Sequence, residues 1–233
     1  MSMSYSWLEF FLVLLAFVVS HAIPAFPALR ARLITHLGRR VYFLTYGATS
    51  LALLIWLVTA ASNTPYVELW PATENLLWVP RLTMLPAVIL AVNGLIAPNP
   101  LSLTMNRYDA FDPVKPGIVG IVRHPVLCAT LIWSVSHILA NGTLAHALLF
   151  GSFAVMSVAG MVALDRRRKA RLGLYEWRRL AALAPLLPLF PSLLGGWRPT
   201  LSIRTVWPSV LGTAVYVALA AGHVWFAGVP SYS

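Results

Sequence analysis

Residues 144–169 read LAHALLFGSFAVMSVAGMVAL followed by DRRRK, an apolar run that ends in a cluster of charged residues. No Asp, Glu, Lys or Arg interrupts the run from Leu144 to Leu164. The run is as long as the roughly 20 residues that a helix needs to cross a hydrocarbon core of ~30 Å. The pattern predicts a transmembrane helix whose C-terminal end meets the cytoplasm, because cytoplasmic loops hold an excess of Lys and Arg.

The composition of the whole chain agrees with a lipid environment. Apolar residues make up 59% and charged residues only 10% of the 233 positions, whereas an ordinary soluble domain carries about 25% charged residues. So few charges cannot cover a water-soluble surface, and they make a nucleic-acid partner a poor explanation of the net charge of +10. The single cysteine, Cys128, excludes an intrachain disulfide and a multi-cysteine metal site.

Similar apolar runs recur along the chain. We therefore predict an all-α, polytopic transmembrane helix bundle of about six spans, near residues 7–26, 41–61, 76–97, 120–140, 144–164 and 205–228. The first run carries Glu9 and has no Lys or Arg before it, so it lacks the basic start of a secretory signal peptide and is interpreted as a retained helix.

The basic residues alternate between the two sides of these spans. Sixteen of the 17 Lys and Arg residues fall in the first loop, the third loop and the segment after the fifth span, and only Arg81 does not. Positive charge marks the inside, so the N-terminus is predicted to be periplasmic in a bacterial cytoplasmic (inner) membrane. The sixteen are Arg30, Arg32, Arg39, Arg40, Arg107, Lys115, Arg123, Arg166, Arg167, Arg168, Lys169, Arg171, Arg178, Arg179, Arg198 and Arg204.

A seventh apolar stretch, residues 180–196, is interrupted by Pro185, Pro188 and Pro191. Each interior proline removes a backbone hydrogen bond that lipid cannot replace. Basic residues also flank the stretch on both sides. An interfacial or re-entrant segment is favoured over a seventh span, and a broken helix packed within the bundle is the alternative.

One face of the fourth predicted span carries polar side chains at helical spacing, those of Thr130, Ser134, His137 and Asn141. A polar stripe in a membrane helix faces the bundle interior. His137 could there ligate a metal or haem through Nε2 while an acceptor orients its other nitrogen. The alternative is a hydrogen bond between helices that only fixes their packing.

Three more histidines lie at the ends of predicted spans. His223 follows a series of small residues that allow close approach of another helix. His21 precedes a proline-rich break, where it is either a functional helix end or an interfacial residue in contact with water. His124 follows Arg123 and precedes Pro125, a pattern that an anionic headgroup contact would also explain.

Together these motifs resemble the NnrU family. The resemblance rests on residues 20–24 (SHAIP), 27–33 (PALRARL), 122–125 (VRHP), 136–142 (SHILANG) continuing to Asp165-Arg166, and Gly222-His223 with the ending 228–230 (GVP). The family consists of bacterial inner-membrane proteins associated with denitrification, and its core is similar to the zeta-carotene isomerase of plants and cyanobacteria. The resemblance implies one membrane domain over residues 1–233, with a five-helix core (1–168) and a C-terminal part (169–233).

The isomerase uses b-type haem, so the resemblance implies haem b as cofactor and His21 and His137 as its iron ligands. Their depths differ by roughly 15 Å at the rise of a helix. Pairs matched in depth are His21 with His124 and His137 with His223, so all four are candidates. Ser134 stands where the isomerase has a cysteine and Thr143 where many NnrU sequences have aspartate, which puts any thiol-dependent mechanism in doubt.

Three functions follow as expectations from this resemblance. The first is a haem protein of nitric-oxide or denitrification metabolism. The second is a haem-dependent cis–trans isomerase acting on a carotenoid-like polyene or another apolar substrate that enters from the lipid. The third is a non-enzymatic factor that handles haem or assists assembly of a respiratory complex. Membrane lipid is the expected surrounding partner in every case.

Overall fold

The structure, a computed structural model, describes residues 3–23, 26–105, 110–188 and 203–228. All regular secondary structure in these ranges is helical, apart from one isolated bridge between Glu68 and Thr143. Four helices are long and apolar enough to cross a membrane, and two shorter apolar helices, Ser6–Ala22 and Pro125–Asn141, accompany them. The chain is therefore an all-α, multi-pass membrane protein, as predicted.

The helices fall into two compact units, which we describe separately. Unit 1 comprises residues 1–71 and 142–149, and unit 2 comprises residues 72–141 and 150–233. The long helix α6 (Leu144–Leu172) begins in unit 1 and continues in unit 2.

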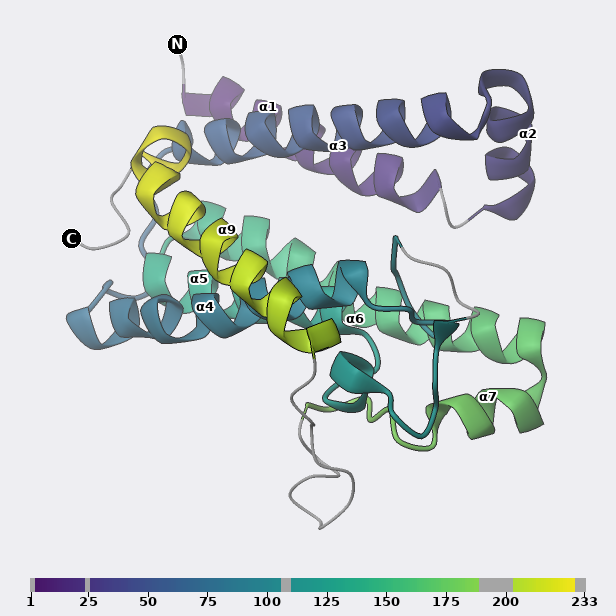
Figure 1. The fold of residues 1–233 in the computed structure, drawn as a ribbon. Helices are drawn as coiled ribbons and strands as arrows, with labels where there is room; N and C mark the ends of the chain where they lie inside the picture. The colour runs from purple at the N-terminus through teal and green to yellow at the C-terminus, as the bar shows by residue number, and fades with distance from the viewer. Residues whose placement is uncertain (1–2, 24–25, 106–109, 189–202, 229–233) are drawn as a thin grey trace. The chain divides into compact units, whose positions relative to one another are not determined.

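Unit 1 is a helical hairpin closed by a short helix (Figure 1). Helices α1 (Met3–Ala22) and α3 (Arg39–Ser62) pack side by side, and α2 (Pro27–Leu37) connects them. Phe10, Val13 and Phe17 are buried and recur at helical spacing, so they form the inner stripe of α1. Glu9 near the start of α1 accepts a hydrogen bond from Trp56 Nε1 in α3 at 2.8 Å.

Unit 2 is built on α4 (Glu74–Ile96), which packs against both α5 (Pro125–Asn141) and α9 (Ile203–Ala227) (Figure 1). A 3-10 turn, η3 (Gly117–Gly120), precedes α5, and α7 (Leu174–Ala181) follows α6. Small residues allow these contacts: a Cβ at Gly94 of α4 would meet Pro125 at 2.6 Å, and one at Gly212 of α9 would meet Ile89 at 2.8 Å.

The core of unit 2 lies where the start of α5, η3 and the end of α7 meet. Its members are almost all aliphatic: Leu90, Leu101, Ile118, Val119, Val122, Cys128, Ala129, Met161, Leu180, Ala181 and Ala184. By contrast, large apolar side chains on the outer helix faces are exposed, such as Val155 at 69% and Val210 at 65%. Such an outer surface suits lipid rather than water.

The helix boundaries correct some of the predicted spans. The first helix ends at Ala22 instead of residue 26, and the helix predicted over 120–140 begins only at Pro125 because η3 occupies its first residues. Helix α6 extends past the predicted residue 164 to Leu172. Helices α2 and α7 lie in basic segments that the hydropathy pattern left without helix.

The stretch 180–196 is described only up to residue 188. Helix α7 ends at Ala181, and residues 182–188 form turns and irregular chain. The remainder, which includes Pro191, lies outside the described residues. The first half is therefore not part of a membrane-spanning helix, as the interfacial or re-entrant interpretation requires.

Candidate functional site

Two of the four candidate histidines, His137 on α5 and His223 on α9, come together in unit 2. Their ring centroids lie 6.5 Å apart with an angle of 36° between the ring planes. One member of the polar stripe on α5, His137, thus lies close to α9. His21 belongs to unit 1 and His124 to the opposite end of α5.

The ring orientation of His137 is fixed by its own helix. Its Nδ1 atom lies 2.8 Å from the carbonyl oxygen of Trp133. A carbonyl only accepts hydrogen bonds, so Nδ1 carries the proton and Nε2 carries the lone pair of a neutral imidazole. Metal-ligating histidines are oriented in this way, by donation of the other ring N–H to a carbonyl or carboxylate.

Aromatic side chains surround the His137 ring. Phe150 and Trp133 lie with ring centroids 5.0 and 5.7 Å from it, and Phe153 packs against Trp133 at 5.2 Å. The His137 ring is therefore in contact with an aromatic cluster. A planar, apolar group or a buried metal ligand set is compatible with such walls.

His21 in unit 1 shows the same local arrangement as His137. Its Nδ1 atom lies 2.9 Å from the carbonyl oxygen of Phe17, one helical turn earlier, and its ring stacks on Phe17 at 4.0 Å. Tyr46 of α3 lies 5.7 Å from the ring. Both histidines that the resemblance names as ligands therefore present Nε2 as the lone-pair nitrogen when neutral.

His124 differs, because both of its ring nitrogens contact protein groups and its side chain is fully buried. Nδ1 lies 2.8 Å from Ser102 Oγ, and Nε2 lies 3.1 Å from Asp165 Oδ1. With the imidazole neutral, Nε2–H donates to the carboxylate and the Ser102 hydroxyl donates to Nδ1. His124 is 0% exposed, so its interpretation as a headgroup contact is wrong.

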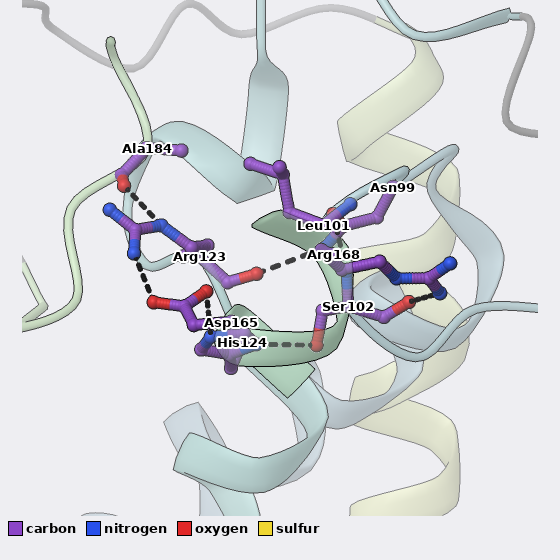
Figure 2. A network of polar contacts seen from close by, with 8 residues as sticks. All are labelled: Asn99, Leu101, Ser102, Arg123, His124, Asp165, Arg168 and Ala184. Atoms are coloured by element: carbon purple, nitrogen blue, oxygen red, sulfur yellow. Dashed lines mark hydrogen bonds and ion pairs between the residues drawn. The ribbon is translucent and has the colours of Figure 1, made fainter. Parts of the chain in front are cut away.

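Arg123 extends this network to three segments of chain (Figure 2). Its guanidinium donates to Asp165 Oδ2 through Nη1 and to the Ala184 carbonyl through Nε at 3.0 Å. Its own carbonyl accepts a hydrogen bond from Asn99 Nδ2, also at 3.0 Å. The side chains of Arg123 and Asp165 are only 12% and 14% exposed, so this ion pair lies largely inside the protein.

Asn99 and Ser102 complete the network from the turn that follows α4. Asn99 Oδ1 accepts hydrogen bonds from the backbone N–H groups of Leu101 and Ser102, at 3.0 and 3.1 Å. Arg168 Nη2 donates to the Ser102 carbonyl at 3.3 Å. The residues thus tie the post-α4 turn, the start of α5, the end of α6 and the segment after α7 to one another (Figure 2).

The order Ser102–His124–Asp165 resembles a hydrolytic triad only superficially. Ser102 and His124 are both 0% exposed, and a nucleophilic serine must meet its substrate. We therefore interpret the network as a structural clamp that holds these chain segments together. Its members are Asn99, Ser102, Arg123, His124, Asp165 and Arg168. The structure pairs Asp165 of α6 with Arg123 and His124 at the start of α5.

Asn99 and Ser102 were missed by the sequence reasoning. The only local signal is that an Asn side chain can accept hydrogen bonds from backbone N–H groups two or three residues later and so stabilise a turn. That signal does not point to His124. The described residues contain no group of three or more His, Cys, Asp or Glu side chains that could hold a metal ion.

The fold and these sites define a multi-pass, all-helical membrane protein with one buried histidine, His124, and a pair of partly buried histidines, His137 and His223, on two of its helices. The chain belongs to the NnrU family, whose model, described as NnrU protein, matches residues 9–231. No curated protein and no solved structure matches the chain.

Proposed function

We propose that this protein binds b-type haem between α5 and α9, with His137 and His223 as the iron ligands. The distance between their rings carries the proposal. Two metal–nitrogen bonds of about 2 Å each, with about 1 Å from each nitrogen to its ring centre, separate two rings on one metal atom by roughly 6 Å. The observed centroid distance is 6.5 Å.

The chain's own groups fit this role in three ways. The Trp133 carbonyl holds His137 with Nε2 available to a metal when the ring is neutral. Phe150 and Trp133 would exclude water from the ligated face and supply apolar contact to a porphyrin. Bound haem would supply an iron whose redox and ligand-binding properties depend on these surroundings.

The physiological setting that we propose follows the NnrU family. The protein would act in nitric-oxide or denitrification metabolism, in the bacterial cytoplasmic membrane with its N-terminus periplasmic. An N-terminal fusion to alkaline phosphatase, which is active only outside the cytoplasm, tests the orientation. An inactive fusion in a well-expressed protein contradicts it.

Spectroscopy of the detergent-purified protein tests haem binding. We expect a low-spin, six-coordinate haem spectrum in the oxidised and reduced protein, either as isolated or after addition of haemin. His137→Ala and His223→Ala should each abolish that spectrum, whereas His146→Ala is the matched control. His146 interacts with Thr143 through Nδ1, at 2.7 Å, and should leave the spectrum unchanged.

Two results would change this assignment. A colourless protein that takes up no haemin would overturn haem binding altogether. Loss of the spectrum in His21→Ala with retention in His223→Ala would transfer the second ligand to His21. His124→Ala should keep the haem spectrum but lower the stability of the protein, because the His124 ring nitrogens contact Ser102 and Asp165.

The aromatic walls around His137 favour haem-dependent cis–trans isomerisation of an apolar polyene as the second candidate function. Trp133, Phe150 and Phe153 form a contiguous aromatic group that a polyene can contact. Supplying a cis-carotenoid to cells that express the protein tests this function. An unchanged isomer profile, alongside an intact haem spectrum, rejects the isomerase and retains the haem protein.

A further inference from the structure

The end of α6 and the outer face of α7 form a strongly basic surface, which is independent of the histidine pair. Between residues 165 and 179 the chain has seven Lys or Arg residues and two acidic ones. Six of the seven are exposed: Arg166, Arg167, Lys169, Arg171, Arg178 and Arg179. We call the exposed residues of 166–179 the basic surface.

Both acidic residues in this range already have cationic partners. Asp165 binds Arg123 and His124 inside the protein. Glu176 accepts two hydrogen bonds from Arg179, at 2.8 and 2.7 Å, and this contact lowers the pKa of Glu176 below its usual value. The partners of these two carboxylates are therefore Arg123, His124 and Arg179, and not Arg166, Arg167 or Arg178.

Arg166 and Arg167 lie on the outward side of α6. The side chains of Asp165 and Arg168 point to the clamp, where they contact Arg123 and the Ser102 carbonyl. The positions three and four residues away from Arg166 and Arg167 are occupied either by apolar side chains or by the cations Lys169 and Arg171. None of these positions has a carboxylate. Like charges at such spacing repel one another and destabilise a helix, so a bound external anion would reduce this repulsion.

The surface also has an apolar part at the level of the membrane interface. Gly173, with φ of 78°, ends α6 and turns the chain into α7, so that Trp177 comes to lie 4.1 Å from Lys169 Nζ. Leu174 is 53% and Tyr175 84% exposed at the start of α7. Residues 174, 175, 178 and 179 share one face of α7, while Leu180 on the opposite face is in the core.

An apolar edge with a tyrosine beside several arginines is typical of a helix at the headgroup level of a membrane. The apolar run of α6 ends at Leu164, so the following eight residues rise about 12 Å beyond the hydrocarbon before α7 turns back. The basic surface thus lies at the depth of lipid phosphates. By the distribution of charge this is the cytoplasmic leaflet, which carries the anionic lipids.

We propose that Arg166, Arg167 and Arg178 form a binding site for the headgroups of anionic phospholipids, with Leu174 and Tyr175 inserted beside the phosphates. A nucleic acid would also neutralise the arginines but would leave Leu174 and Tyr175 exposed to water. The lipid is therefore the occupant that accounts for both parts of the surface.

Native mass spectrometry of the full-length protein in detergent tests this site with phosphatidylglycerol and phosphatidylcholine as probes. The triple variant Arg166→Gln/Arg167→Gln/Arg178→Gln should bind phosphatidylglycerol on the order of a hundredfold more weakly, because each arginine contributes about a factor of five. Phosphatidylcholine binding should not change. The control Arg30→Gln/Arg32→Gln/Arg40→Gln removes the same charge from another basic segment and should retain most of the affinity.

Equal losses in the two triple variants would show that the lipid responds to overall charge, and would overturn the site. An unchanged affinity in the first variant would overturn it as well. Soluble glycerol phosphate or a short oligonucleotide that displaces the lipid from the wild-type protein at equal concentration would assign the site to that ligand instead. Unchanged circular dichroism and elution volume establish that each variant is folded.

Discussion

His124 Nε2 lies 3.1 Å from Asp165 Oδ1 although 41 positions separate the two residues in the sequence. Arg123 binds the other carboxylate oxygen, so one aspartate at the end of α6 holds two consecutive residues at the start of α5. The carboxylate thereby fixes the end of one apolar helix against the beginning of another. Stability measurements can test how much the protein depends on it.

Asp165→Asn should lower the free energy of unfolding by about 2–3 kcal/mol, somewhat less than the 3–5 kcal/mol typical of a fully buried pair. The variant keeps the shape of the side chain but leaves the Arg123 cation without its counter-ion. Thermal unfolding in detergent, followed by circular dichroism, measures the change. Glu176→Gln is the matched control and should have no measurable effect, because its pair with Arg179 is solvent-exposed. Equal effects of the two changes would contradict the clamp.

Gly94→Ala should destabilise the α4–α5 contact by about 1–3 kcal/mol, as overpacking does. The new Cβ would meet Cγ and Cβ of Pro125 at 2.6 and 2.8 Å, and a proline ring cannot rotate away. Gly151→Ala places the same methyl group on α6 with no atom within 4 Å and should be neutral or slightly stabilising. Comparison of the two unfolding midpoints checks the prediction, and an unaffected Gly94→Ala protein would refute the close helix contact.

A double-mutant cycle should detect the polar contact between α4 and α9. Asn93 Nδ2 donates to Ser209 Oγ at 3.1 Å. Coupling between Asn93→Ala and Ser209→Ala should be about 0.6 kcal/mol and at most ~1.7 kcal/mol, the range found for hydrogen bonds between membrane helices. Thr83→Ala combined with Ser209→Ala serves as the uncoupled control, since Thr83 bonds within its own helix to Val79. Zero coupling in the first cycle would show that the contact contributes nothing.

The apolar helices could be predicted from the sequence because their signal is local and additive. Runs of apolar residues long enough to cross a bilayer mark α3, α4, α6 and α9, and the structure confirms them. Helices α2 and α7 escaped because they are short and rich in arginine, and their ends depend on the positive φ values of Gly38 and Gly173. A hydropathy profile does not reveal such turns, because it depends on side-chain polarity and not on backbone dihedral angles.

The polar contacts were less predictable, for a physical reason. The side-chain partners of His124 lie 22 and 41 positions away, and a sequence displays only neighbours on one helix. The depth of a residue in the membrane can be predicted from the sequence, because each helical residue rises about 1.5 Å along the axis. That rule matched His137 with His223, and the structure brings their rings together. Whether the pair ligates iron remains a prediction.

Gly142→Ala should be more disruptive than the same change at Gly38. Both glycines have positive φ, 65° and 77°, and such backbone conformations disfavour alanine by about 1–3 kcal/mol. At Gly142 the new Cβ would also collide with the carbonyl oxygen of Trp70, whereas nothing lies within 4 Å of Gly38. Unfolding curves of the two variants measure the difference. Equal destabilisation would mean that the backbone at Gly142 and Trp70 can move apart without a loss of free energy of unfolding.

The contact at Gly142 also has a consequence for the order in which the protein is made. The Gly142 carbonyl accepts the backbone N–H groups of Leu69 and Trp70, and Leu144 N–H donates to Val67. The loop after α3 therefore lacks these partners until the α5–α6 turn, some 70 residues later in the chain, has been synthesised. During that interval the backbone groups of Val67, Leu69 and Trp70 lack the partners that they have in the finished fold. Ribosome-stalled chains that end before residue 142 should accordingly be cleaved by an external protease between α3 and α4, and longer chains should resist it.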